Sequence, residues 1–265
     1  MIFEEVTIGK CRLILGDCVD VLQSLEAQSV DAVITDPPFF HPVNHYVNAR
    51  DAEPAKKTLS DMSALKHFFR VTAVELDRVL KRSGSAYWFC DGQSYGHSFE
   101  ALYPHFKRVR PLIWDKVVSF NGYTWRHQHE LIAWGEMPEA KQIPTGDGDI
   151  IRCRAVPVKE RVHPAEKPVD LLAALVKKTP SDAVVLDCFM GSASTGVAAV
   201  MHGRGFVGIE FERRYFDIAC QRIEAAQSKV GFGGTAEQGD LLTANVQAQR
   251  PEAASPPKGR AGAPG

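Results

Sequence analysis

The sequence predicts an α/β fold built on a doubly wound, mostly parallel sheet. Short apolar runs, typical of buried strands, alternate along the chain with amphipathic stretches of helical spacing. Such alternation favours parallel strands joined by helical crossovers. The chain has 265 residues, of which 45% are hydrophobic and 24% charged, so it can form one core of ordinary globular composition.

The strand-like segments are short, apolar and bounded by turn residues. Residues 30–35 (VDAVIT) are typical, because this apolar run is soon followed by two prolines, which stop helix and sheet alike. Segments of this kind occupy 11–15, 30–35, 85–91, 108–116, 130–135, the beginning of 183–196, and 205–212.

Helical apolar spacing is found between these segments. The longest example is 64–84, which is predicted to end at Gly84, since glycine commonly stops a helix. Further helices are predicted directly after Gly16-Asp17, over 93–103, over 169–179, from the end of the 183–196 turn, and over 213–230.

The chain is predicted to contain one folded domain, residues 1–230, followed by a tail. Residues 231–265 are rich in Gly, Ala, Pro and Gln, a composition typical of disorder. Residues 40–62 have weak periodicity and are predicted to form a long loop, a feature that is usually functional or disordered in a compact domain.

The formal net charge of −1 excludes a general electrostatic attraction to nucleic acid, so any such surface has to be a local patch. No apolar run approaches the roughly 20 residues of a membrane span, and the N-terminus lacks a signal-peptide pattern. None of the six cysteines forms a C-x-x-C pair, so free thiols are expected and a zinc site is not. These features predict a cytoplasmic protein.

The first chemical motif is a glycine turn between a strand and a helix. Asp187 ends an apolar strand, and Gly191 with small neighbours leads into a helix whose N-terminus offers free N–H groups. The turn has neither the lysine of a P-loop nor the G-x-G-x-x-G of dinucleotide folds. Glu210 ends the next strand, where an acid can accept hydrogen bonds from ribose hydroxyls. A nucleoside such as S-adenosylmethionine fits better than NAD, and the alternative is a tight turn without a ligand.

The second motif is Asp36-Pro37-Pro38-Phe39, which follows the strand at 30–35. The Asp36 carboxylate and a proline carbonyl are both acceptors, which suits an amino group with two donors. Phe39 offers a face on which a planar base can stack, and the stiff prolines set the acceptor spacing before the substrate arrives. The alternative is a turn that only terminates the strand.

These motifs resemble those of DNA methyltransferases that act on exocyclic amino nitrogens. Asp36–Phe39 matches the catalytic motif of that family, and residues 187–195 match its D-x-F-x-G-S-G-S/T-T motif, with Ala193 in place of a glycine. Residues 163–168 match H-P-x-x-K-P, and Gly16–Leu22 resembles G-D-x-x-x-x-L. The catalytic motif precedes the cofactor motif, which is the permuted order of the beta class.

The resemblance implies a seven-stranded sheet with helices on both faces and a target-recognition insertion at about 105–165. It implies S-adenosylmethionine as the cofactor and double-stranded DNA as the substrate, with the target base flipped out of the duplex. Aspartate at the first motif position favours adenine N6. The alternatives are methylation of cytosine N4 in DNA, a related protein that acts on RNA, or a regulator without activity. Homodimers are common in this class, and a prokaryotic or phage origin is expected.

Site residues follow from the same resemblance. The expected catalytic residues are Asp36, Pro37, Pro38 and Phe39. The residues expected at the cofactor are Asp17, Cys18, Asp36, His163, Lys167, Pro168, Asp187, Phe189, Gly191, Ser192, Ser194, Thr195 and Glu210.

Two basic regions, the first interleaved with Trp114, Tyr123 and Trp125, lie between the catalytic and cofactor motifs, where this class carries target recognition. A solvated charged face is the alternative for any single residue. Loop 40–62 is expected to close over the flipped base. The residues expected to contact DNA are Lys107, Arg108, Arg110, Lys116, Arg126, Arg152, Arg154, Lys159 and Arg161.

Overall fold

A computed structural model describes residues 3–38, 62–118, 124–140, 143 and 146–232. Residues Met1–Gly234 form one compact unit. The tail expected at 231–265 lies outside the described residues beyond Phe232, and so does the loop expected at 40–62 except Met62. Every helix in the described ranges is too short or too polar to span a membrane.

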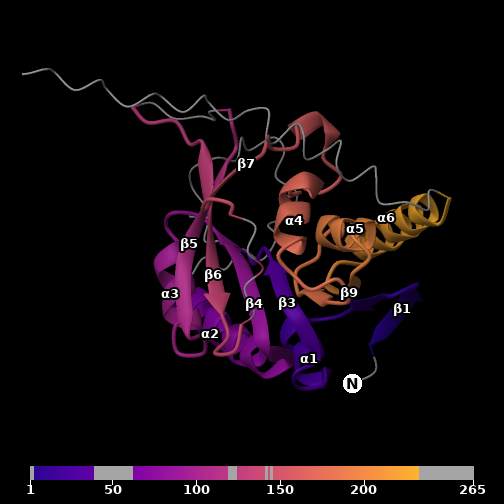
Figure 1. The fold of residues 1–265 in the computed structure, drawn as a ribbon, viewed down its shortest axis with the longest axis horizontal. Coiled ribbons are helices and arrows are strands. Elements are labelled where there is room, and N and C mark those ends of the chain that lie inside the picture. Colours follow the sequence, from indigo (N-terminus) through magenta and orange to yellow (C-terminus); the bar gives the residue numbers. More distant parts are fainter. Residues whose placement is uncertain (1–2, 39–61, 119–123, 141–142, 144–145, 233–265) are drawn as a thin grey trace, which may run out of the picture. The chain divides into compact units, whose positions relative to one another are not determined.

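Within the described residues, nine strands form one sheet in the order β1-β2-β9-β8-β3-β4-β6-β5-β7 (Figure 1). Their bounds are β1 Glu4–Ile8, β2 Cys11–Leu15, β3 Val30–Thr35, β4 Leu80–Cys90, β5 Arg108–Asp115, β6 His129–Glu136, β7 Ile150–Arg152, β8 Val184–Asp187 and β9 Gly205–Glu210. The five strands from β2 to β4 along this order are mutually parallel. Strands β1 and β6 run antiparallel to their neighbours. The predicted mostly parallel sheet is confirmed.

The expected number of seven strands is wrong, because two edge strands were missed. Strand β1 (EEVTI) is mostly solvent-exposed and therefore carries little of the apolar signal by which strands are recognised. Strand β7 has three residues and pairs only with β5. Each of these strands pairs with a single neighbouring strand, so hydrogen-bond pairing, and not a hydrophobic pattern, identifies it as a strand.

Helices cover both faces of the sheet. They are α1 Cys18–Ser24, α2 Met62–Val79, α3 Tyr95–Leu102, α4 Val169–Val176, α5 Ser194–Met201 and α6 Arg213–Phe232, with a short 3₁₀ turn at Val158–Glu160. Helices α1, α2 and α3 pack in one apolar cluster, and α4, α5 and α6 pack in a second. Figure 1 shows the two groups of helices flanking the sheet.

Successive residues of the central strands supply the two clusters in turn. Ile14 and Val33 join the first cluster, whereas Leu13 and Ile34 join the second. Side chains alternate between the faces of a strand, and both faces are covered here, so the central strands are continuous apolar runs.

The predicted helix at 64–84 is too long, and the strand predicted at 85–91 begins too late. Helix α2 ends at Val79 and β4 begins at Leu80, which is fully buried and pairs with Val30 of β3. The register then shifts, so that Ser85 pairs with Ala32. Long-range pairing with β3 outweighs the local helical spacing, and Gly84 belongs to the irregular part of the strand.

We predict that Gly84→Ala destabilises the fold by about 1–3 kcal/mol, because overpacking forces the backbone to shift. A Cβ at Gly84 would lie 2.6 Å from the carbonyl oxygen of Asp31. Urea unfolding measures the change. Gly92→Ala is the matched control, since a Cβ there meets nothing within 4 Å, and an equal loss in both variants would refute the packing argument.

Candidate active site

The predicted site residues gather at the carboxyl edge of the parallel strands. Asp36 follows β3, Asp187 ends β8, and Glu210 ends β9. Asp17 follows β2 and caps α1, accepting hydrogen bonds from the N–H groups of Val19 at 2.9 Å and Asp20 at 3.4 Å. These strands are neighbours in the sheet, so four acidic residues that are distant in sequence share one edge.

Asp187 is buried and accepts three hydrogen bonds. The Thr35 hydroxyl donates at 2.8 Å, the Thr195 hydroxyl at 2.7 Å, and the backbone N–H of Phe189 at 3.1 Å. Burial raises the pKa of Asp187 to about 6, although the hydrogen bonds favour its charged form. Asp187 thereby ties the end of β3 to the start of α5.

The glycine turn after β8 is bound to the end of β9. Gly191 has φ +51° and donates its N–H to Glu210 Oε2 at 3.0 Å, while Glu210 Oε1 accepts the N–H of Glu212 at 2.7 Å. Burial raises the pKa of Glu210 above its ordinary value. Each carboxylate oxygen keeps a second lone pair for a ligand hydroxyl.

Ala193, which stands where the motif has glycine, adopts the left-handed conformation with φ +60° and ψ 38°. An L-residue there costs roughly 1–2 kcal/mol. Its methyl group is fully buried in the second cluster, so packing offsets part of this cost.

The histidine motif at 163–168 packs against the same turn. The His163 ring lies 3.4 Å from where a Cβ on Gly191 would be, and it meets the Tyr215 ring edge-on at 4.3 Å. Glu166 accepts the N–H of Val162 at 2.8 Å. The motif is therefore part of the wall beside the glycine turn.

Arg222 of α6 connects this motif to the glycine turn, and sequence reasoning missed it. Its guanidinium donates to the Ser192 hydroxyl at 2.6 Å and the Ser192 carbonyl at 3.0 Å, and it pairs with Glu166 at 2.9 Å. Ser194 donates weakly to Glu166 at 3.5 Å. A single arginine in a charged helix gives no sequence signal, because such residues are usually solvated.

The two carboxylate oxygens of Asp36 have different surroundings. Lys167 donates to Oδ2, whereas Oδ1 is buried and has no hydrogen-bond partner among the described residues. Burial raises the pKa of Asp36, Lys167 opposes the rise, and Glu130 adds to it. Burial alone would lower the pKa of Lys167, but its two carboxylate neighbours outweigh burial and raise it. The raised pKa of Lys167 agrees with a cation that has two acidic partners, whereas the raised pKa of Asp36 reflects its burial.

Glu130 is the second residue of β6 and was also missed by the sequence analysis. Its Oε2 lies 3.6 Å from Lys167 Nζ, and its Oε1 lies 2.5 Å from Lys116 Nζ. Lys116 also lies 5.0 Å from the centre of the Trp114 ring. An acid before an apolar strand usually marks a solvated strand end, so only the fold reveals its partners.

The remaining expected residues have diverse surroundings. Cys18 is buried, and burial raises its pKa to about 12, so it stays a thiol. The Phe189 ring packs 5.7 Å from Phe68, and Pro37 is buried whereas Pro38 is exposed. Phe39 lies outside the described residues. Pro168 is buried and caps α4.

Phe211 follows Glu210 directly, and its side chain is 73% exposed. The sequence analysis passed over it, although an aromatic residue next to the acid at a strand end was a visible signal. Phe211 therefore lies at the same edge of the sheet as Glu210.

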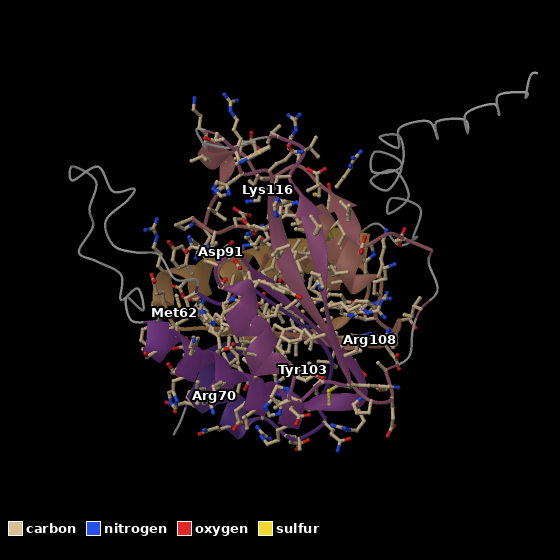
Figure 2. All side chains as sticks on the ribbon, turned by 90° about the vertical axis from the view of Figure 1, so that its left-hand side faces the viewer. Met62, Arg70, Asp91, Tyr103, Arg108 and Lys116 are labelled. Carbon is tan, nitrogen blue, oxygen red and sulfur yellow. The ribbon has the colours of Figure 1, made fainter. Side chains whose placement is uncertain are left out.

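The basic residues expected to contact DNA are divided by the structure. Arg108 and Lys116 lie at opposite ends of β5 (Figure 2), and Arg108 pairs at 2.5 Å with buried Glu136. Arg161 donates to two backbone carbonyls, those of Val156 and Pro164.

Other members of the basic group are more exposed. Arg152 pairs with Asp115 at 3.3 Å, and Arg110 lies over the Trp134 ring at 5.8 Å. The remaining exposed members are Lys107, Arg126, Arg154 and Lys159.

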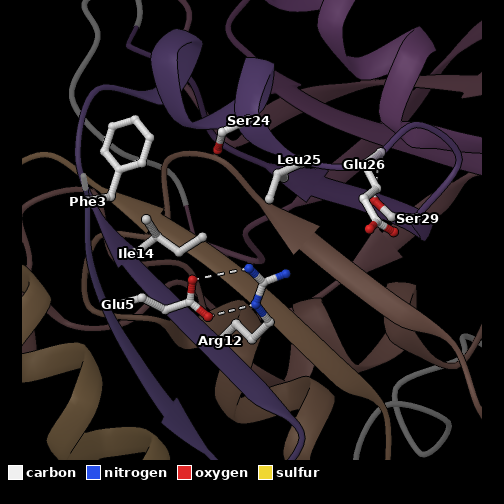
Figure 3. A pocket seen from close by; sticks show the side chains of 8 residues that line it. All are labelled: Phe3, Glu5, Arg12, Ile14, Ser24, Leu25, Glu26 and Ser29. Atoms are coloured by element: carbon white, nitrogen blue, oxygen red, sulfur yellow. Dashed lines mark hydrogen bonds and ion pairs between the residues drawn. The ribbon is translucent and has the colours of Figure 1, made fainter. Parts of the chain in front are cut away.

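A cavity of about 440 Å³ lies away from this edge, beside β1 and β2 (Figure 3). Its lining includes Arg12 and Glu5, which form a two-pronged ion pair at 2.8 and 3.1 Å. None of the expected site residues lines it. No group of three or more His, Cys, Asp or Glu in the described ranges is arranged to hold a metal.

Comparisons with known proteins identify the family of this chain. The sequence model of the family described as DNA methylase (N6_N4_Mtase) matches residues 30–221. The Escherichia coli (strain K12) protein named "Putative methylase YubD" is 32% identical over 229 residues, covering 84% of this chain and 94% of that protein.

Solved structures share the fold. The M1.HpyAVI–SAM complex has a TM-score of 0.63 at 21% identity, over 80% of this chain and 98% of that one. The PvuII DNA methyltransferase, described as cytosine-N4-specific, has a TM-score of 0.64 at 15% identity, over 92% of this chain and 95% of that one. At these identities the likeness establishes the architecture alone.

We predict that Asp187 makes the protein less stable as pH rises from about 4 to about 6. The pKa of Asp187 is higher in the folded state, so the folded state binds more protons in this window and unfolding free energy falls with pH. The shift corresponds to about 3 kcal/mol. The test is the unfolding free energy of wild type minus that of Asp187→Asn across this range. A difference that is constant with pH would contradict the prediction.

Proposed function

This chain belongs to the DNA methylase family, and we propose that its reaction is methylation of the N6 amino group of adenine in double-stranded DNA. One observation carries the proposal. Asp36 has a buried carboxylate oxygen without a hydrogen-bond partner among the described residues, at the strand edge that also bears the glycine turn. An unsatisfied buried acceptor is costly, so it suits a donor that the substrate brings.

S-adenosylmethionine is the cofactor of this family, and the residues present fit it. Gly191 adopts the left-handed conformation that glycine favours, and its lack of a side chain lets a ligand approach the backbone of the turn. Glu210 has free lone pairs for ribose hydroxyls, and exposed Phe211 suits the adenine ring. S-adenosylmethionine supplies an electrophilic methyl group.

The protein residues supply position and polarity rather than a nucleophile. Asp36 Oδ1 and the Pro37 carbonyl would accept the two amino hydrogens and draw the nitrogen lone pair out of ring conjugation. The rigid Pro-Pro segment sets the spacing of these acceptors before the substrate binds. A stacked base cannot reach such a site, so the base has to leave the duplex.

Cytosine N4 is the second candidate base. The same acceptors suit its amino group, and a protein of the same fold is described as cytosine-N4-specific. Adenine is favoured by the aspartate at the first position of the catalytic motif. Both reactions use the same chemistry, so the modified nucleoside has to identify the base.

DNA contact is proposed for the surface around the end of β5 and the start of β6. Trp125 is 87% exposed and stands next to exposed Arg126, a pairing that suits stacking on a base and contact with a phosphate. Two more exposed arginines lie near this surface, because β7 pairs with β5. Arg152 is the last residue of β7, and Arg154 lies two residues beyond it.

We predict that purified protein, S-adenosylmethionine and unmethylated genomic DNA yield N6-methyladenine, measured by mass spectrometry of the digested nucleosides. Asp36→Ala should lower the yield by at least about a thousandfold, since both polarisation and orientation are lost. Urea unfolding checks that the variant is folded. Detection of N4-methylcytosine would change only the identity of the target base in the proposal. Absence of any methylated nucleoside, although the wild-type protein binds the cofactor, would refute the proposal.

We predict that Phe211→Ala weakens binding of S-adenosylmethionine about tenfold, because stacking of an aromatic ring on a base contributes roughly 1–3 kcal/mol. Calorimetric titration of the free protein gives the dissociation constant. Tyr103→Ala is the matched control, since Tyr103 is an aromatic side chain with 60% exposure on α3's C-terminal side. Equal affinity of Phe211→Ala and wild type would exclude Phe211 from the cofactor site.

A further inference from the structure

Asp36 is the first member of a series of four mostly buried charges that alternate in sign. Lys167 contacts Asp36, Glu130 lies 3.6 Å from Lys167, and Lys116 lies 2.5 Å from Glu130. Their side chains are between 10% and 19% exposed. We name these four residues the charge series.

The charge series joins four segments that are distant in sequence. Asp36 follows β3, Lys167 precedes α4, Glu130 lies in β6, and Lys116 follows β5. Burying four charges is costly unless each has a partner, and an end-to-end series of opposite charges supplies them. Such a cost is unnecessary for the fold alone, because apolar residues of similar size pack at least as well.

We propose that Glu130 and Lys116 are positioning residues for methyl transfer, which act through Lys167 to set the charge around Asp36 and keep its Oδ1 available to the target amino group. The inference rests on the proposed function and adds to it two residues that do not touch the substrate. Lys167 holds Oδ2, so the other oxygen is the one left for a donor.

The charge of Glu130 matters because the reacting nitrogen would become positive as its lone pair bonds to the methyl group. The methyl–sulfur bond of the donor would break to leave a thioether, and the nitrogen would then release one of its protons to solvent. Lys167 by itself would place a positive charge beside that nitrogen and weaken Asp36 as an acceptor. Glu130 shares Lys167 with Asp36 and offsets this charge, while Lys116 holds Glu130 in place. Buried charges interact strongly because little water screens them.

Replacing Glu130 and replacing Lys116 should have opposite effects on Asp36. Glu130 raises the pKa of Asp36 and Lys116 lowers it, after the larger effects of burial and Lys167. Glu130→Gln should therefore move the Asp36 titration to lower pH, and Lys116→Met should move it to higher pH, each by about one pH unit. Other titratable groups that interact with the Asp36 charge are Asp187 and Cys90, which both variants leave intact.

The first readout needs no activity. Carbon-13 NMR of aspartate-labelled protein follows the Asp36 carboxyl, which is identified by its loss in Asp36→Asn. Opposite shifts in Glu130→Gln and Lys116→Met support the proposal. Unchanged titration in both variants, or shifts in the same direction, would overturn it whether or not the protein methylates DNA.

The second readout is the single-turnover rate of methylation of unmethylated genomic DNA across pH. The acid limb should shift as the NMR titration does. Glu130→Gln should also lower the plateau rate about tenfold with less than a twofold change in cofactor affinity. Equal plateau rates would refute the positioning role. Shifted NMR titrations without methylation by wild type would instead refute the proposed function.

Glu136→Gln is the matched control. Glu136 ends the same strand β6, is buried and pairs with Arg108 of β5, but it lies at the opposite end of the strand. Glu136→Gln should reduce stability, but it should move neither the Asp36 titration seen by NMR nor the acid limb of the methylation rate. The double variant Lys116→Met/Glu130→Gln covers the case in which Glu130→Gln fails to fold. In the double variant the two opposite shifts of the Asp36 titration midpoint should largely cancel. A midpoint displaced by more than the shift in either single variant would contradict the proposed role of the charge series.

Discussion

The buried carboxylate of Asp187 is the interaction on which the site depends. It accepts hydrogen bonds from Thr35 at the end of β3 and from Thr195 at the start of α5. One side chain thus links the strand that carries Asp36 to the helix that follows the glycine turn. Both hydroxyl donors and the carboxylate are nearly inaccessible to water, so the link is short and geometrically defined.

A second layer of polar contacts joins the remaining pieces to this link. Arg222 connects Glu166 to Ser192, and Glu210 binds the Gly191 N–H. Segments from the middle and the end of the chain are therefore held around one turn. Each contact involves a charged partner, and charge-assisted hydrogen bonds are the stronger kind, which suits a site that has to be ordered before its ligands arrive.

Much of the fold follows from sequence patterns with a clear physical origin. Strands buried on both faces, such as β3 and β9, are largely apolar and were recognised, whereas the mostly exposed strand β1 was not. The end of α2 was misjudged because Leu80 satisfies a helical pattern and a strand pairing equally, and only the presence of β3 selects the strand. Local propensity contains no information about a partner 50 residues away.

The sequence by itself determined the chemistry of this protein: a stiff Asp-Pro-Pro turn, a glycine turn and an acid at a strand end, in a set order. These features are local, because each depends on residue type and on neighbours within one turn or strand. The tertiary structure alone decided which charges meet. Glu130, Lys116 and Arg222 acquire their roles from parallel strands and packed helices that bring distant segments to one edge. Electrostatic partners are set by distance in space, which no local pattern encodes.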